Sequence, residues 1–248
     1  MQVKFMKEKI MYQNYLFDLY GTLVDIHTDE QDQKLWEKMA FLYGYYGAMY
    51  EPQELRKEYE RLCKKEAQAI TNVSVPEIDI VKVFRKLYEQ KGVQVSLDTI
   101  VLTGQMFRIT SMEYVKLYDG VIELLEGLKA KGKKVYLVSN AQRIFTYHEM
   151  KYLDILKYFD GITYSSDVAV AKPDVKIYEE VLEKYNLKKE ESIMIGNDPT
   201  ADVLGSKAAG LDSLYIHSNI SPELTEEVQA TYLVMDGDVT KVMPLILK

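Results

Sequence analysis

Short apolar runs alternate with helical patterns from Tyr118 onward, and this alternation limits the possible folds more than any other feature of the sequence. A helical stripe from Val121 to Leu128, with apolar residues three and four positions apart, precedes the first run. The runs are short enough to be strands, and we predict strands at Val135–Val138, Gly161–Tyr164, Ser192–Ile195 and Ser213–Ile216. Successive strand and helix units predict an α/β fold with a parallel, doubly wound (Rossmann-like) sheet, whose ligands bind outside the carboxyl ends of the strands.

The segment from about His27 to Tyr114 shows a different pattern. Its apolar residues recur at helical spacing, as from Ile80 to Tyr88, where they stand at offsets 0, 3, 4, 7 and 8. No convincing strand is found there. We therefore predict an all-helical cap at residues 27–114, inserted into an α/β core made of residues 1–26 and 115–248.

Composition narrows the class of partner. The chain has 31 Lys and Arg against 38 Asp and Glu, which gives a formal charge of −7. A basic face that binds nucleic acid is therefore not expected, and we expect a small-molecule substrate instead. Its single cysteine, Cys63, excludes an intramolecular disulfide and suits a reducing compartment. The N-terminus has no apolar stretch of the about 20 residues that a membrane span needs. We predict a cytoplasmic protein without a membrane partner.

Polar residues follow several of the predicted strands. The apolar run that begins at Tyr15 ends in a carboxylate, and two later strands end in polar pairs, while a lysine stands in a loop before a proline. These residues are Asp18, Ser139 with Asn140, Asn197 with Asp198, and Lys172. Because parallel strands present their carboxyl ends at one edge, we expect these side chains to converge.

The segments FDLYGTLVD, LVSN, AKPD and IGNDPTAD stand in the order of the four motifs of the haloacid dehalogenase-like superfamily, which the chain resembles from Asp18 to Asp202. The helical insertion after the first motif looks like that superfamily's helical cap. The resemblance implies a hydrolase with Asp18 as its nucleophile.

The residue types agree with this chemistry, since a carboxylate nucleophile needs its target held by positive charge and hydrogen-bond donors. Thr22, Ser139 and Lys172 are suited to binding an anionic group, and Asn140 is a further candidate for substrate binding. Taken singly, Thr22 and Ser139 could cap helices, and Lys172 could pair with a surface acid.

Asp18, Asp198 and Asp202 would repel one another at a shared sheet edge and raise one another's pKa unless a cation lay among them. We therefore predict a Mg²⁺ ion at this edge. Its direct ligands would be the carboxylates of Asp18 and Asp198, the backbone carbonyl of Tyr20 and water molecules. Asp202 would act on the metal site without touching the ion, by orienting its ligands. Asp202 could instead be an acid at a helix N-terminus.

Tyr20 departs from the pattern of the superfamily's phosphatases, which usually carry at this position a second Asp that protonates the leaving group. A phenol with a pKa of about 10 is a poorly matched base at neutral pH, although it could donate a proton. Tyr at this position resembles the 2-haloacid dehalogenase branch, since a halide leaves without a proton. Tyr178, six residues after Lys172, also matches the pattern of that branch. It completes an apolar helix stripe as well, so packing alone explains it.

Two other features favour a phosphatase. IGNDPTAD keeps the acidic, metal-binding form of its motif, and the cap has no arginine from Gly44 to Tyr50 to receive a halide, Arg56 being the nearest. We favour a Mg²⁺-dependent hydrolase of a small phosphorylated metabolite that works through an aspartyl-phosphate on Asp18. A metal-independent 2-haloacid dehalogenase and a catalytically impaired phosphate-binding protein stay open as alternatives.

Overall fold

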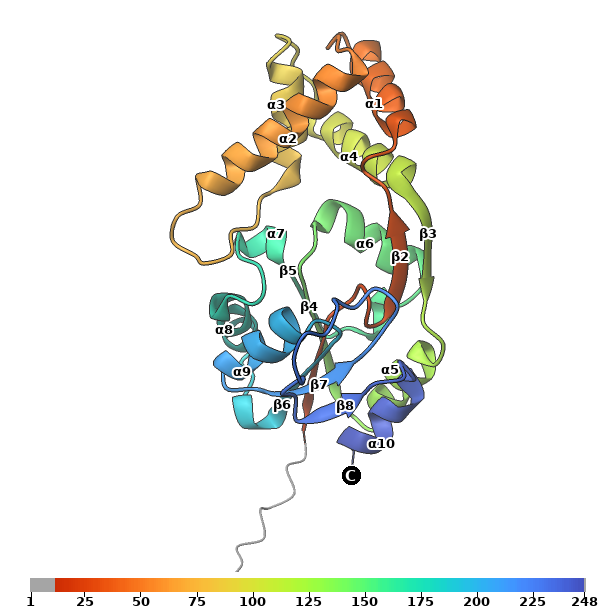
Figure 1. Ribbon diagram of the computed structural model, residues 1–248, viewed down its shortest axis with the longest axis vertical. Coiled ribbons are helices and arrows are strands. Elements are labelled where there is room, and N and C mark those ends of the chain that lie inside the picture. The colour runs from red at the N-terminus through yellow and green to blue at the C-terminus, as the bar shows by residue number, and fades with distance from the viewer. Residues whose placement is uncertain (1–11, 248) are drawn as a thin grey trace, which may run out of the picture.

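A six-stranded parallel sheet forms the centre of the core in the computed structural model, which describes residues 12–247 (Figure 1). The prediction about the N-terminus falls largely on residues 1–11, outside the described residues. The sheet order is β5-β4-β1-β6-β7-β8. Its strands are β1 (Asn14–Phe17), β4 (Lys134–Ser139), β5 (Gly161–Tyr164), β6 (Ser192–Gly196), β7 (Asp212–Ile216) and β8 (Tyr232–Val234). The predicted parallel sheet is confirmed, and β8 is an edge strand that the sequence analysis missed.

Both faces of the sheet are covered, as a doubly wound fold requires. Successive side chains of a strand point to opposite faces. Tyr15 and Phe17 of β1 pack in a cluster with α5 (Val121–Ala130), whereas Leu16 between them packs in another cluster with α8 (Val175–Lys184). The core helices are α5 (Val121–Ala130), α6 (Arg143–Tyr152), α7 (Ser165–Val168), α8 (Val175–Lys184), α9 (Gly205–Ala208) and α10 (Val242–Ile246), with a π-helix at Pro199–Leu204 and single 3₁₀ turns at Leu156–Tyr158, Lys189–Glu191 and Val239–Lys241.

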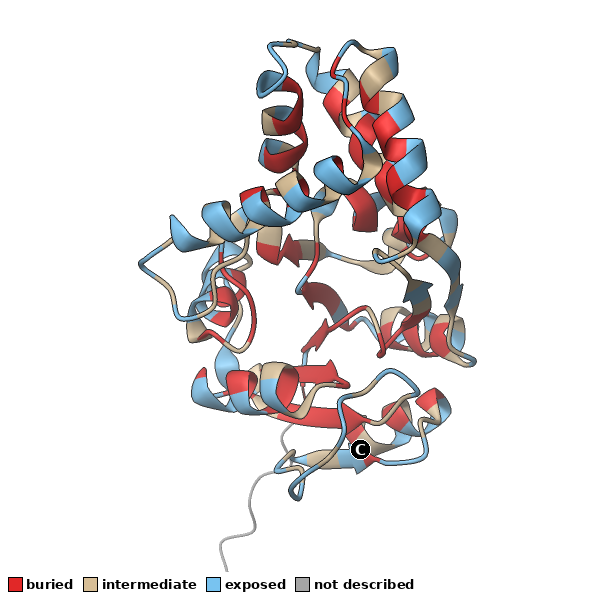
Figure 2. Cartoon of the chain, turned by 45° about the horizontal axis from the view of Figure 1, so that its top comes forward, coloured by how far each residue is buried: buried red, intermediate tan, exposed pale blue. Residues whose placement is uncertain are grey.

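The cap is a separate group of helices above the core (Figure 1). Its helices are α1 (Gln33–Tyr45), α2 (Pro52–Gln68), α3 (Ile80–Glu89) and α4 (Leu97–Ser111). They enclose a second buried cluster, in which Trp36, Tyr43, Phe84 and Phe107 take part and which Phe145 of α6 joins from the core (Figure 2). None of the helices in residues 12–247 is long and apolar enough to cross a membrane.

A strand pair joins the cap to the core, and this corrects the prediction of no strand between His27 and Tyr114. β2 (Val24–Thr28) and β3 (Met112–Leu117) are antiparallel and lie side by side between the two parts (Figure 1). Apolar and polar residues alternate over part of each strand, from Val24 to His27 in β2 and from Val115 to Leu117 in β3, which is the signal of a half-exposed strand that the helical reading overlooked. The division of the chain at residues 26/27 and 114/115 stays a prediction.

Candidate active site

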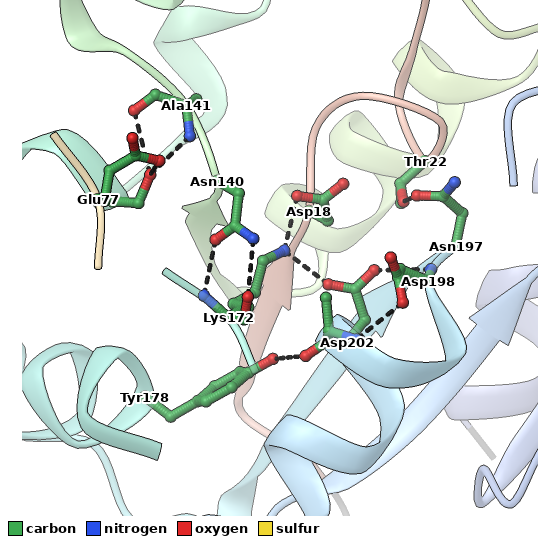
Figure 3. Close-up of polar contacts among 12 residues, drawn as sticks. Asp18, Thr22, Glu77, Asn140, Ala141, Lys172, Tyr178, Asn197, Asp198 and Asp202 are labelled. Atoms are coloured by element: carbon green, nitrogen blue, oxygen red, sulfur yellow. Dashed lines mark hydrogen bonds and ion pairs between the residues drawn. The ribbon is translucent and has the colours of Figure 1, made fainter. Parts of the chain in front are cut away.

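The ammonium of Lys172 lies between two carboxylates at the carboxyl edge of the sheet (Figure 3). Its Nζ donates to Asp18 Oδ1 at 2.7 Å and to Asp202 Oδ1 at 2.6 Å, and all three side chains are buried. Burial favours the neutral amine, but the charges of Asp18 and Asp202 outweigh it and raise the pKa of Lys172. Burial also raises the pKa of Asp202, to about 7, with Lys172 opposing the rise. The predicted convergence is therefore found, and Lys172 offsets charge inside the site and not at the surface.

Two neighbouring segments hold this arrangement in place. Asp18 directly follows β1, and its backbone N–H donates to Ile195 O of β6 at 2.9 Å. Asn140 binds the backbone of Lys172 in both directions, because its Nδ2 donates to Lys172 O at 3.0 Å and its Oδ1 accepts from Lys172 N at 2.7 Å. The Asn140 amide thus positions Lys172, and its predicted contact with substrate stays a prediction.

The π-helix Pro199–Leu204 directs Asp202 back toward Lys172. Asp198 caps this helix through Oδ1, which accepts from the N–H groups of Thr200 and Ala201, both at 2.8 Å. Asp202 Oδ2 accepts from Asp198 N at 2.9 Å, so both Asp202 oxygens have protein donors. A Cβ on Gly196 would lie 2.2 Å from Asp202 Cγ, and only glycine permits this approach.

Tyr178 anchors the same helix from α8. Its ring is buried in the core cluster, and its hydroxyl donates to Ala201 O at 2.5 Å (Figure 3). Burial raises the pKa of this phenol well above its ordinary value. The residue packs and positions the helix, as the stripe pattern indicated.

Thr22 lies in the turn after Asp18, where its hydroxyl donates to Asn197 Oδ1 at 3.2 Å. Gly21 in this turn has φ +83°, a conformation that favours glycine, and a Cβ there would meet the Asn197 side chain at 2.2 Å. Thr22 and Asn197 therefore connect the loop after Asp18 to the end of β6.

The hydroxyl of Ser139 is buried and has no hydrogen-bond partner within the described part of the chain. It lines a cavity of about 210 Å³ together with Asp18 and Lys172. A buried polar group without a partner costs free energy unless a ligand or water satisfies it. This serine is thus free to bind a group that enters the cavity.

The side chain of Tyr20 is bound by α6 and by the cap. Its hydroxyl donates to Glu149 Oε2 and lies 2.8 Å from Thr146 Oγ1. Arg108 of α4 donates from Nε to Glu149 Oε1 at 2.6 Å and lies over the Tyr20 ring. Burial and the charge of Glu149 raise the pKa of Tyr20, so it is not a base at neutral pH. Arg108 and Glu149 escaped the sequence analysis because neither follows a strand.

The residues predicted to bind Mg²⁺ are compatible with it. Within residues 12–247 no three His, Cys, Asp or Glu side chains form a metal-binding group, so a purely carboxylate cage is not present. Asp18 and Asp198 each use Oδ1 in hydrogen bonds, whereas Oδ2 of each makes none to the described residues. Both side chains line the cavity. Two carboxylates supplemented by a carbonyl and waters suit Mg²⁺. The assignment of Asp18, Tyr20, Asp198 and Asp202 to the metal stays a prediction.

A cap segment between α2 and α3 reaches the core beside the site, which the sequence analysis did not foresee. Glu77 accepts from Ser165 Oγ at 2.8 Å, and the same Oγ accepts from the backbone N–H of Ala141, which follows Asn140 (Figure 3). Ser74 donates from its N–H and its hydroxyl to Asp174, at 2.6 and 2.7 Å. Arg56, by contrast, is on α2 and binds Glu60 and Gln31.

Comparison with known proteins identifies the family. The profile of the haloacid dehalogenase-like hydrolases matches residues 12–210. The chain belongs to this family. A glyceraldehyde 3-phosphate phosphatase of Methanothermobacter thermautotrophicus is 27% identical over 141 residues, 57% of this chain. The match spans 60% of that relative's length.

Solved structures of the family share the fold. HAD-hydrolase YfnB of Bacillus subtilis, bound to magnesium, has a TM-score of 0.57 at 20% identity and covers 95% of this chain and 99% of its own. A 2-haloacid dehalogenase of Pseudomonas syringae has a TM-score of 0.63 at 18% identity, covering 96% and 98%. At these identities the likeness concerns the fold, so the choice between phosphatase and dehalogenase depends on this chain's own residues.

Proposed function

We propose that this chain is a Mg²⁺-dependent phosphohydrolase that acts on a small phosphorylated metabolite in the cytoplasm through an aspartyl-phosphate on Asp18. The lining of the cavity is the main support for this proposal: it includes a buried ammonium, a carboxylate, and a buried hydroxyl that has no hydrogen-bond partner among the described residues. The ammonium and the hydroxyl suit an anionic group, and the Asp198 carboxylate in the same cavity suits the Mg²⁺ that offsets phosphoryl charge. The relative named as a glyceraldehyde 3-phosphate phosphatase supports the same reaction class.

Each residue has a part in the proposed reaction. Lys172 orients the Asp18 carboxylate through Oδ1, and this carboxylate attacks phosphorus while the bond to the leaving oxygen breaks. Ser139 donates to a phosphoryl oxygen, and Lys172 offsets the charge on the group as it is transferred. Mg²⁺, held by Asp18, Asp198 and the Tyr20 carbonyl, would neutralise phosphoryl charge when bound. Water then attacks phosphorus and releases Asp18 together with inorganic phosphate.

Tyr20 gives this reaction little acid or base catalysis. With its hydroxyl donating to Glu149, it neither accepts a proton from water nor faces a leaving alkoxide as a matched acid. Slow turnover on alkyl phosphates follows, with faster turnover where the leaving group needs no proton. Tyr20→Phe should therefore lose less than the about 10²-fold that removal of a general acid costs. A larger loss in kcat would make Tyr20 the acid.

A 2-haloacid dehalogenase is the second candidate, because Tyr20 stands two residues after the nucleophile, as it does in that branch. Its halide would need a cap arginine. Arg56 binds Glu60 and Gln31, and Arg108, beside the Tyr20 ring, is paired with Glu149. Neither is free to receive a halide in this arrangement.

One assay separates the candidates. Purified protein is incubated with para-nitrophenyl phosphate and with L-2-chloropropionate, each with Mg²⁺ and with EDTA, beside Asp18→Asn. We expect phosphate release that requires both Mg²⁺ and Asp18, with the variant slower by about 10⁴-fold or more. Chloride release that survives EDTA would establish the dehalogenase instead. Binding of Mg²⁺ and orthovanadate without turnover would identify the impaired binder.

A further inference from the structure

The loop after β7 supplies an apolar wall of the active-site cavity, to which Ala201 of the π-helix adds only a methyl group. Ile220 and Pro222 line it beside the polar residues, and none of the described residues from 27 to 114 does. Ile220 is an aliphatic side chain that stays 38% exposed at this position. The cap, which the inserted position in the sequence would suggest as the source of selectivity, does not provide this wall.

Hydrogen bonds hold the loop on both sides of Ile220. Ser221 Oγ accepts from Asn197 Nδ2 at 3.3 Å and from Ser218 N at 2.9 Å. On the other side, Asn219 Nδ2 donates to Asp25 Oδ1 of β2 at 3.0 Å, and Asn219 Oδ1 accepts from Tyr118 at 2.6 Å. The position of Ile220 is therefore fixed relative to the polar residues of the cavity.

The size and chemistry of the cavity restrict the ligand. Its volume of about 210 Å³ is below the roughly 300–1,000 Å³ of pockets for drug-sized ligands. The charged and hydroxyl-bearing residues suit the anionic end of a substrate, and Ile220 and Pro222 offer no hydrogen bond to the remainder. A charged or strongly hydrated group against them would lose water without replacement.

We propose that Ile220, supported by Pro222, contacts the leaving group and selects compact, uncharged ones. This inference rests on the proposed phosphohydrolase function and names its substrate class: phosphate monoesters or acyl phosphates in which a short carbon unit follows the phosphoryl group. Burying Ile220 against such a unit removes apolar surface from water. Ile220 is a specificity-determining residue and takes no part in bond breaking.

The test compares kcat/KM for acetyl phosphate with that for the bulkier para-nitrophenyl phosphate. Ile220→Ala should shift the ratio about tenfold toward para-nitrophenyl phosphate, and Ile220→Phe should shift it in the opposite direction. The change should lie mainly in KM, and the inhibition constant of inorganic phosphate should stay the same, since phosphate alone does not reach Ile220. Leu233→Ala is the matched control, an aliphatic side chain 44% exposed on β8 that does not line the cavity.

The outcomes separate this inference from the proposed function. A wild-type enzyme that hydrolyses both substrates, with a ratio that neither Ile220 variant moves by more than Leu233→Ala does, overturns the inference alone. A wild-type protein that hydrolyses neither substrate with Mg²⁺ overturns the proposed function, and the inference with it.

Discussion

The edge of the sheet and the boundary between cap and core both depend on polar side chains, but the two regions use them differently. At the edge, Lys172, Asp18 and Asp202 are buried together, and each charge is offset by its neighbours. At the boundary, separate ties such as Arg108 with Glu149 and Ser74 with Asp174 stand apart from one another. A cluster of coupled charges resists change as a unit, whereas separate ties break one at a time. The edge should therefore be rigid and the boundary adjustable.

Removing the central charge should give the largest effect. Lys172→Met leaves Asp18 and Asp202 buried without their shared partner, a change that costs about 3–5 kcal/mol in other buried pairs. The free energy of unfolding in urea, with and without Mg²⁺, measures it. Lys189→Met, at an exposed lysine, is the control. A loss below about 1 kcal/mol would mean that the three charges do not compensate one another.

A smaller loss should follow from filling the space beside Asp202. Gly196→Ala places a Cβ 2.2 Å from Asp202 Cγ, so backbone or carboxylate must move, at a cost of about 1–3 kcal/mol. Gly44→Ala in α1 is the matched control, because its Cβ meets the flexible end of Met49 at 3.2 Å. That change should be neutral or stabilise by about 0.5–1 kcal/mol. Equal melting temperatures for the two variants would contradict a rigid edge.

The difference between sheet edge and boundary also explains which contacts could be predicted from the sequence. Asp18, Ser139 and Asp198 each follow an apolar run, and parallel strands must deliver such residues to one edge. Their convergence with Lys172 could therefore be predicted without coordinates, as could the doubly wound sheet.

The boundary left no comparable signal. Arg108 and Glu149 stand 41 residues apart on helices, where a charged residue normally faces solvent. Ser74, Glu77 and Ile220 lie in loops without periodicity, so their partners depend on how the chain folds back. The strands β2 and β3 carried an alternating pattern over only part of their length, and each strand is short and lies beside a strongly helical segment.

A double-mutant cycle measures the most buried tie of the boundary. Arg108 and Glu149 have side chains 14% and 7% exposed, against 54% and 23% for the Arg143–Asp167 pair of the core. Arg108→Met and Glu149→Gln should show a coupling of about 1.5–3 kcal/mol. The control cycle, with Arg143→Met and Asp167→Asn, should give a coupling energy of less than about 1 kcal/mol. Equal couplings would remove the basis for treating Arg108–Glu149 as a cross-domain tie.

The smallest effect should come from Ser74 and should depend on pH. Burial would raise the pKa of Asp174, but hydrogen bonds from Lys176 N and from Ser74 outweigh it and lower the pKa below its ordinary value of 3.8. A carboxyl whose pKa is lower in the folded state stabilises the protein fully above its unfolded-state pKa, and this contribution disappears as the pH falls through the folded-state pKa.

Ser74→Ala should therefore cost about 0.5–1.5 kcal/mol at pH 7 and progressively less as the pH falls through the lowered folded-state pKa of Asp174. The difference in unfolding free energy between wild type and variant isolates this tie, because other carboxyls titrate alike in both. Thr240→Ala, which removes a hydroxyl bound to the exposed Asp238, should show little cost at either pH. A cost at Ser74 that stays constant from pH 7 to pH 3 would mean that the hydroxyl does not act through the Asp174 charge. The boundary would then be held by packing and not by separable polar ties.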